Sequence, residues 1–441
     1  MGHNKTLTIE NLNPRILDVE YLVRNPITIH AYEGNHNFPF DRVIRTNIDD
    51  FYASGNQISI TYIRQFVAGC TYPELMESPN FPLDIKQKVE RLLSACGGKN
   101  LGSYSETQGI VTVREDIASY IQQRDDYPSD ANNIYLCNGA TDGINTILLL
   151  LMNNNPNKPS GIMISVPQYP LYSAKGYLYR IATRSCSLFY LNIFYGRLRT
   201  LSEYGAHPIE CYLDEDNNWS LSMDELERSL NESKDRCESR GQVLSQENIE
   251  NAIRFANKHR LFILADEVYQ ENVYLPDSKF VSFKKVLMSL SAPYNQLELA
   301  SFHSASKGWY GECGSRCGYY ELINIDKDVK VQLNILQSAR PCVTSWGQAC
   351  YGSNLQSMHF HALKFQKKAI EYAKSKNMTP DEFYCFQLLG KTGICVLSGN
   401  DFKQRPGTYH LRTTFLPPVD QMKEMVERFH TFHMSFLHEW K

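Results

Sequence analysis

The chain has 441 residues, of which 42% are hydrophobic and 21% are charged, and its formal net charge is −3. These values are ordinary for a globular enzyme of two or three domains, and they favour neither a nucleic-acid partner nor a membrane partner. The 12 cysteines are scattered without the paired spacing of a zinc site, so we expect reduced thiols in a reducing compartment and no bound metal.

Hydrophobic periodicity predicts helices that alternate with short apolar strands along the chain. The predicted elements are helices over residues 83–96, 142–152, 247–259 and 419–440, helix starts at Ser222 and Thr379, and strands over residues 133–137, 162–166 and 261–264. This alternation predicts an α/β domain with a mainly parallel sheet. Ligands of such sheets bind beyond the carboxyl ends of the strands.

A single lysine, Lys307, lies among small residues in the segment 304–318, and Arg316 follows it nine positions later. Small neighbours let a flat cofactor lie against the backbone, and nearby cations favour the neutral amine that attacks a carbonyl. Ser304 and Arg316 have the donors to hold a phosphate, the arginine through two parallel hydrogen bonds. The alternative is a solvated lysine in a loop rich in glycine and serine.

Asp266 stands where the predicted strand 261–264 ends, and Tyr269 follows three residues later. A carboxylate at a strand end can face a pyridine nitrogen and keep the ring protonated, which makes the ring a strong electron sink. The hydroxyl of Tyr269 could then donate to a hydroxyl on the ring. The alternative is a capping aspartate beside a surface tyrosine.

The turn at residues 138–143 joins the predicted strand 133–137 to the helix that follows it. Free N–H groups at the start of a helix bind anions, and Gly139 and Ala140 allow a phosphate to approach the backbone closely. By itself this segment is equally typical of an ordinary strand-to-helix turn.

Together these motifs resemble those of the fold-type I aminotransferases of class I and II, and most closely those of the alanine aminotransferases. The resemblance runs from Leu12 through the motifs above to residues 391–396 and the last helix. It implies an N-terminal arm with part of a small domain over residues 1–75. A large cofactor-binding domain with a mainly parallel sheet flanked by helices would cover residues 76–345, and a shortened α+β small domain would cover residues 346–441.

The resemblance also implies a pyridoxal 5'-phosphate site. In this family the lysine forms a Schiff base with the cofactor and moves the substrate proton, which is the role it implies for Lys307. Asp266 begins a match to the family motif Asp-x-x-Tyr, 41 residues before the lysine. The motif implies that Asp266 faces the ring nitrogen and that Tyr269 hydrogen-bonds to the ring hydroxyl. The remaining implied roles are ring stacking by Tyr169, α-carboxylate binding by Arg412, and phosphate binding by Gly139, Ala140, Thr141, Ser304, Arg316 and, across a dimer interface, Tyr104.

The implied reaction converts L-alanine and 2-oxoglutarate into pyruvate and L-glutamate. The implied binding partners are small-molecule amino acids and 2-oxo acids, and the implied assembly is a homodimer. A glutamate–glyoxylate aminotransferase is an alternative, because side-chain selectivity depends on the shape of the pocket. A second alternative is a catalytically impaired homologue that serves as a dimerisation partner. The N-terminus lacks the apolar core of a signal peptide, so we expect a cytoplasmic location, with the mitochondrion as the alternative.

Three departures from the family pattern bear on activity. The strand and asparagine-rich loop that precede the family's Gly-Gln-Val are absent before Gly241, residues 175–197 look like an insertion, and the chain jumps over family sequence near residues 349–353. Altered splicing or gene modelling explains such clean changes better than gradual drift. We expect the lost strand to destabilise the sheet, with residues 175–197 poorly placed in the chain order to replace it.

Overall fold

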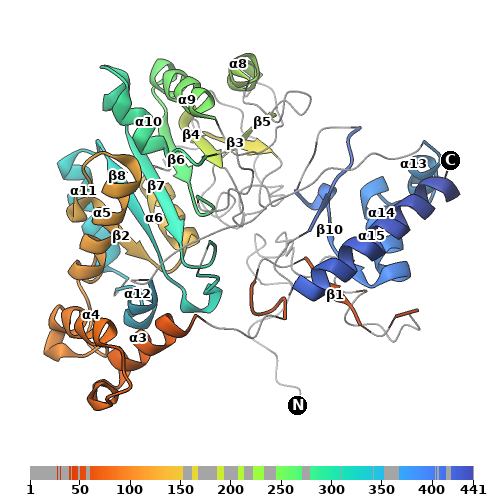
Figure 1. Cartoon of the computed structure of the whole chain (residues 1–441). Helices are drawn as coiled ribbons and strands as arrows, with labels where there is room; N and C mark the ends of the chain where they lie inside the picture. Colours follow the sequence, from red (N-terminus) through yellow and green to blue (C-terminus); the bar gives the residue numbers. More distant parts are fainter. Residues whose placement is uncertain are drawn as a thin grey trace, which may run out of the picture.

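The computed structural model forms two bodies, a larger one built around a seven-stranded sheet and a smaller one formed mostly by C-terminal elements (Figure 1). It describes residues 27, 30, 39–40, 42–47, 50–55, 60–151, 161–166, 186–192, 207–212, 222–232, 245–270, 279–308, 310–340, 342–351, 367–402, 404, 407–413 and 419–440. None of the helices among these residues is both long and apolar enough to cross a membrane. The division at residues 75/76 and 345/346 stays a prediction.

The predicted helices and strands are present in the described residues. The helices are α3 Thr61–Thr71, α4 Leu83–Ser94, α5 Val111–Asp125, α6 Ala140–Leu151, α8 Met223–Glu232, α9 Gln246–His259, α10 Phe283–Ser289, α11 Lys327–Ser338, α12 Ser345–Tyr351, α13 Lys367–Ser375, α14 Pro380–Thr392 and α15 Val419–Glu439. The strands are β1 Ile44–Arg45, β2 Ile134–Cys137, β3 Gly161–Val166, β4 Cys186–Asn192, β5 His207–Tyr212, β6 Phe262–Asp266, β7 Leu299–Ser304, β8 Gly318–Ile323, β9 Ile394–Cys395, β10 Leu397–Ser398 and β11 Leu411–Arg412.

Local chemistry explains where several of these helices begin. The hydroxyl of Thr379 accepts a hydrogen bond from the backbone N–H of Glu382, and the Glu382 side chain accepts one from the backbone of Thr379. This reciprocal capping box satisfies donors that the first turn of a helix leaves unpaired. Ser222 and Ser245 cap α8 and α9 through their hydroxyls, as serine before a helix predicts.

The large sheet has the strand order β2-β8-β7-β6-β4-β3-β5. β8 runs antiparallel to β2 and β7, and the other neighbouring pairs are parallel. The expected α/β fold with a mainly parallel sheet is therefore confirmed. Because β6 and β7 are parallel and adjacent, their carboxyl ends lie at the same edge of the sheet.

The expectation that the sheet lacks a central parallel strand is wrong. β4, which comes from the inserted residues 175–197, lies between β3 and β6 and pairs in parallel with both. Two features explain why chain order does not prevent this. Residues 188–191 form the apolar, aromatic-rich run typical of a buried strand, and the connection from β3 to β4 is long enough for a parallel crossover.

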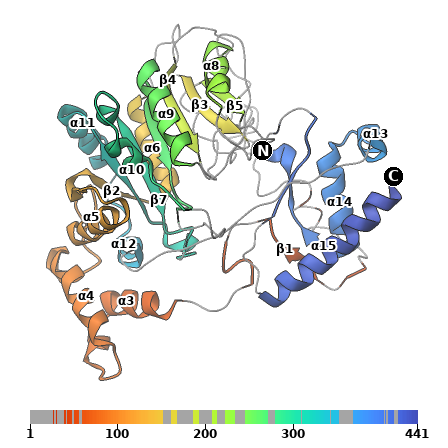
Figure 2. The same ribbon diagram turned by 45° about the horizontal axis from the view of Figure 1, so that its top comes forward.

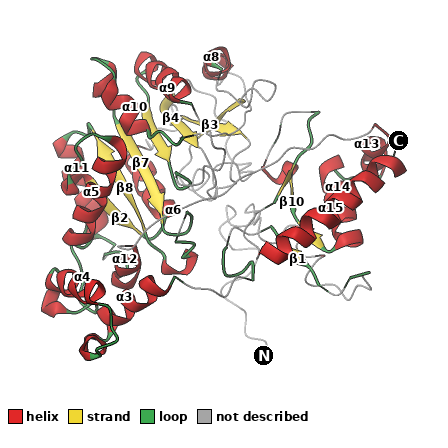
Figure 3. Cartoon of the chain, viewed as in Figure 1, coloured by secondary structure: helices red, strands yellow, loops and turns green. Residues whose placement is uncertain are grey.

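Helices cover both faces of the large sheet, as two views of the molecule show (Figures 2 and 3). One face packs against α6 and α11 through buried residues that include Ile144, Phe302 and Leu333. The opposite face packs at one end against α3, α4, α5 and α12, and at the other end against α8, α9 and α10. Consecutive residues of β6 point to opposite faces of the sheet, so Ile263 lies in one of these cores and Leu264 in the other. The sheet is therefore a buried, rigid platform.

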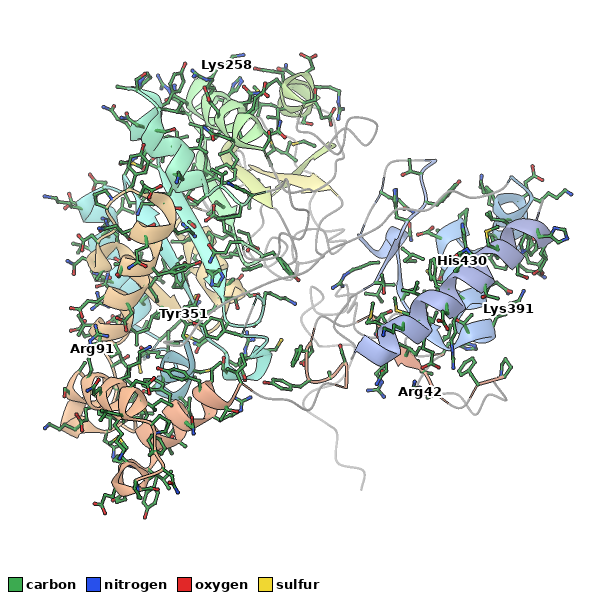
Figure 4. The ribbon with its side chains drawn as sticks, viewed as in Figure 1. Arg42, Arg91, Lys258, Tyr351, Lys391 and His430 are labelled. Atoms are coloured by element: carbon green, nitrogen blue, oxygen red, sulfur yellow. The ribbon has the colours of Figure 1, made fainter. Side chains whose placement is uncertain are left out.

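The smaller body has its own core, formed by α13, α14, α15 and short strands. β1 from the N-terminal part pairs in parallel with β9, and β10 pairs antiparallel with β11. The N-terminal and C-terminal parts of the chain therefore build this body together. Figure 4 shows Arg42, Lys391 and His430 in the smaller body, whereas Tyr351 lies in the larger one.

Candidate active site

The carboxyl end of β6 places Asp266 at the edge of the sheet where a ligand would bind. Only 2% of the Asp266 surface is exposed, and its Oδ1 accepts a hydrogen bond of 3.4 Å from the backbone N–H of Val268. A carboxylate buried to this degree is costly unless a charged or hydrogen-bonding group faces it. A cationic ring nitrogen is one group that meets this need.

Glu267, the next residue, points to the opposite side of the chain from the site. Its carboxylate accepts hydrogen bonds from the backbone N–H of Phe283 at 2.8 Å and from Ser301 Oγ at 2.7 Å, and Arg124 Nη1 lies 3.9 Å away. Burial raises the pKa of Glu267, and the nearby Arg124 opposes this shift. These contacts fix the strand end that carries Asp266.

Lys307 stands three residues after the end of β7 and lies on the same edge. Its Nζ is 5.7 Å from the centroid of the Tyr269 ring, over the ring face, and the lysine is half-buried. This distance is within the range of a cation–π contact. The structure thus brings together Lys307 and Tyr269, which lie 38 residues apart in the chain, on neighbouring strand ends.

A layer of aromatic residues supports the loop that carries Lys307. Tyr310 and Tyr351 stack with ring centroids 5.1 Å apart, and the Tyr310 hydroxyl donates to the backbone carbonyl of Tyr351. The Tyr351 hydroxyl also contacts His303 Nδ1. His303 is therefore part of the buried support of the loop, as a structural histidine would be.

The start of α6 and Arg316 form a second cluster. Arg316 Nη2 donates to the Asn138 carbonyl at 2.9 Å, and Nη1 donates to the Cys313 carbonyl at 3.0 Å. Gly139 has φ = +87°, and a Cβ there would come within 2.7 Å of Arg316 Nη2. Glycine is therefore required at this turn. The guanidinium thus lies against the first turn of α6, which Ala140 and Thr141 open.

This cluster suits a phosphate. The backbone N–H groups of the first turn of α6, with the positive end of the helix dipole, and the charge of Arg316 both attract an anion. Ser304 Oγ, buried at the end of β7, is 3.4 Å from the Cys317 carbonyl and 3.2 Å from the backbone nitrogen of Ser306. The buried Asp266, the half-buried Lys307 and the anion-binding cluster at Gly139 and Arg316 together fit a phosphorylated pyridine aldehyde such as pyridoxal 5'-phosphate.

Two predicted site residues lie elsewhere, and a third is not described. Arg412 is on β11 in the smaller body, with 9% of its surface exposed and Leu397 of β10 opposite it in register. Tyr104 belongs to the larger body and has 80% of its surface exposed. Tyr169 lies outside the described residues.

Two features of this edge were missed from the sequence. β4 ends at Asn192, and the register of the parallel pair sets Asn192 beside Asp266. We expected an asparagine-rich loop to be absent before Gly241, and only the strand order reveals that Asn192 stands beside Asp266. The second feature is Glu312, whose carboxylate accepts from Tyr52 and Arg64. Its partners are far away in the chain, so no local pattern indicates them.

Among the side chains that the structure describes, no group of His, Cys, Asp and Glu residues is arranged to hold a metal ion. The donors at the described edge are instead an amine, a guanidinium, hydroxyls and backbone N–H groups. Such a set suits an organic, anionic ligand rather than a cation.

The comparisons with known proteins give the family. Residues 197–383 match the family model described as aminotransferase class I and II. The chain is 40% identical to human alanine aminotransferase 1, with 99% of this chain and 96% of the relative covered. It is also 32% identical to alanine aminotransferase 2 of Panicum miliaceum, with 99% of each chain covered. The alignment to the human protein is 503 residues long, more than the length of this chain, so the relative carries segments that are missing here.

Solved structures give the same fold. An aminotransferase from Escherichia coli superposes with a TM-score of 0.65 at 19% identity, covering 96% of this chain and 98% of that one. An alanine aminotransferase from Pyrococcus furiosus superposes with a TM-score of 0.66 at 16% identity, covering 96% of this chain and 99% of that one. The sequence relatives, the described site and this shared fold therefore show that the chain belongs to the class I and II aminotransferases, and the human and Panicum miliaceum relatives within that family are alanine aminotransferases.

Proposed function

We propose that this chain is an alanine aminotransferase that interconverts L-alanine and 2-oxoglutarate with pyruvate and L-glutamate. The observation that carries the proposal is 40% identity to an alanine aminotransferase over 99% of the chain. The described edge of the sheet agrees with it, because an amine and a buried carboxylate lie on neighbouring strand ends. We propose that the enzyme is cytoplasmic, with the mitochondrion as the alternative, and that it forms a homodimer.

Pyridoxal 5'-phosphate would supply an aldehyde that condenses with amines and a ring that accepts electrons from the substrate Cα. In this proposal Lys307 holds the cofactor covalently and later moves a proton to and from the substrate as general base and acid. Asp266 faces the ring nitrogen as its anionic partner, and Tyr269 donates a hydrogen bond to the ring hydroxyl. Arg316, Ser304 and the first turn of α6 hold the phosphate.

The substrate is oriented by a residue of the other body. Arg412 would bind the α-carboxylate through two parallel hydrogen bonds, which also sets which bond to Cα faces the ring. Tyr169 would stack on the ring. Tyr104 would reach the phosphate of a second subunit, so that the site is complete only in the dimer.

The test is the absorbance spectrum of the purified protein with added pyridoxal 5'-phosphate, followed by alanine and then 2-oxoglutarate. We expect a band from the lysine-bound cofactor that alanine removes and 2-oxoglutarate restores, with pyruvate released. Lys307→Ala is the matched control and should show neither the band nor turnover. Preference for glyoxylate as acceptor would instead indicate a glutamate–glyoxylate aminotransferase, and a wild-type protein without the band would indicate an impaired homologue.

A further inference from the structure

The crossing segment, which the structure describes at residues 46–47 and 50–54, is anchored to the smaller body at Thr46 and to the larger body at Tyr52. On the side of the smaller body, the backbone N–H and Oγ1 of Thr46 both donate to the Cys395 carbonyl of β9, at 3.1 and 2.8 Å. On the side of the larger body, the Tyr52 hydroxyl donates to Glu312 Oε1 at 2.9 Å. The two anchors lie only six positions apart in the sequence.

The turn that presents Tyr52 is itself fixed. Oδ1 of Asp50 accepts from the backbone N–H groups of Tyr52 at 3.0 Å and Ala53 at 2.9 Å, which is an aspartate-stabilised turn. The neighbouring Phe51 packs on Gly311, where a Cβ would come within 3.0 Å of the Phe51 Cβ. Two adjacent aromatic residues thus contact two adjacent residues of the Lys307 loop.

Glu312 receives this contact in a nearly dry environment, since 8% of its side chain is exposed. Its Oε1 also contacts Arg64 Nη2 at 2.7 Å, and the same Arg64 nitrogen lies 3.1 Å from the Tyr52 hydroxyl. Burial, aided by the bond to Glu312, raises the pKa of Tyr52 to about 12. The phenol therefore remains a hydrogen-bond donor throughout the physiological pH range.

The backbone of Glu312 closes the loop that carries Lys307. The Glu312 N–H donates to the Ala305 carbonyl at 3.0 Å, so residues 305 and 312 form the base of this loop. The Glu312 carbonyl accepts from the backbone N–H and the Oγ of Ser315, at 3.0 and 2.8 Å. The backbone of Glu312 thus closes the Lys307 loop, and the side chain of the same residue binds the crossing segment.

We propose that Glu312, through Tyr52 and Arg64, is a positioning residue that sets the Lys307 loop against the body that carries Arg412. The inference rests on the proposed function, in which Lys307 moves the proton and Arg412 holds the α-carboxylate of the same substrate. Arg412 on β11 pairs with β10, which follows β9 in the chain, and β9 accepts the hydrogen bonds of Thr46. Tyr52, six positions after Thr46, bonds to Glu312. Loss of this tie misplaces the amine relative to the anchored substrate, although neither Glu312 nor Tyr52 is required to touch it.

The test compares Tyr52→Phe, Glu312→Gln and the double variant with wild type. Glu227→Gln is the matched control, because Glu227 also pairs with cations, Lys258 and His259, but lies far from the loop on α8. The first measurement is hydrogen exchange of the backbone amides of residues 305–315 in the cofactor-free protein. We expect exchange about tenfold faster in both single variants and unchanged exchange in the control.

The second measurement is steady-state kinetics with alanine. We expect kcat to fall about tenfold in each variant with little change in KM, because the substrate anchor is intact and only the position of the amine changes. The double variant should lose little more than either single one, since both remove the same tie. A purely structural role would instead speed exchange throughout the larger body.

Unchanged exchange in residues 305–315, or exchange that rises equally in α9 and α10, would overturn the proposal, as would a wild-type kcat in both variants. If wild type itself does not turn over alanine, the proposed function is contradicted. In that case the exchange rates alone decide whether Glu312 ties the loop to the crossing segment.

Discussion

Lys307 and Asp266 reach the same edge of the sheet because each follows a strand, but their surroundings suit different tasks. Asp266 is 2% exposed and held by the strand end, which suits a fixed counter-charge. Lys307 is half-buried on a loop, and its Nζ lies over the ring of Tyr269, so the amine is held less firmly than a group fixed at a strand end. A general base that also forms a covalent bond needs such freedom, and a ring partner does not.

Replacing Arg412 by lysine tests the assigned carboxylate anchor. Both substrates of the proposed reaction share an α-carboxylate, and a lysine cannot reproduce the planar, two-point contact of arginine. We expect KM for alanine and for 2-oxoglutarate to rise together, by about tenfold or more. Initial-rate kinetics with each substrate varied in turn would measure this. A rise for 2-oxoglutarate alone would mean that Arg412 serves the distal carboxylate.

Glu267 gives a prediction about pH. Because burial raises its folded-state pKa above the unfolded value, the folded protein binds the proton more tightly, and the associated stability is present at low pH and lost as pH rises. Glu267→Gln does not titrate. We therefore compare the melting temperature of wild type with that of the variant at a series of pH values. The difference, wild type minus variant, should decrease as pH rises from about 4.5, the ordinary pKa of glutamate, through the raised pKa of Glu267 in the folded protein. A difference that stays constant or grows with pH would contradict the raised pKa.

At the scale of elements, each helix and strand that the sequence predicted has a local signal. The capping box at Thr379 and the apolar run before Asp266 are examples. β4 was misjudged because strand order is set by pairing between distant segments. A run such as residues 188–191 carries no local sign of the neighbours that it will have.

The central place of β4 can be tested with proline. Phe189 pairs with Met163 of β3 and Ile263 of β6, so proline there removes a ladder hydrogen bond and distorts a strand with neighbours on both sides. We expect a loss of about 3 kcal/mol or more in stability. Phe189→Val, which keeps a good strand former, is the control. Denaturant unfolding of both would measure the effect, and equal midpoints would show that β4 does not hold the sheet together.

The residues of the candidate site likewise divide into those that the sequence predicted and those that it did not. Lys307, Asp266 and Gly139 lie at strand ends and turns that the sequence marks, and the structure brings their neighbourhood together. Glu312 and Asn192 were missed because their significance depends on contacts with residues far away in the chain. Arg412 was assigned by resemblance alone, since a single arginine on a short strand has no pattern of its own.

At the scale of the whole molecule, the exposure of Tyr104 agrees with a role toward a second subunit. In this single chain 80% of the Tyr104 surface is exposed, so its side chain is available to a partner. If Tyr104 completes the partner's site, Tyr104→Ala and Lys307→Ala homodimers should both be impaired. A heterodimer of the two would still have one intact site.

Mixing these two variants under conditions that exchange subunits tests that prediction. Random pairing gives heterodimers in about half of the dimers, so activity should recover to about a quarter of the wild-type value. Mixing either variant with itself is the control. No recovery, with exchange verified by mass, would place Tyr104 in the site of its own chain or outside any site.

The placement of β4 also bears on how the protein is synthesised. β3, β4 and β5 are neighbours in the sheet and come from one stretch, residues 161–212, with β3 in the middle of the three strands. This edge of the sheet therefore forms from contacts of short sequence separation, which favours rapid association. These strands leave the ribosome before β6 and β7 are synthesised, so the nascent chain could assemble this edge of the sheet early. The half that carries Asp266 and Lys307 would then be added to a template that already exists.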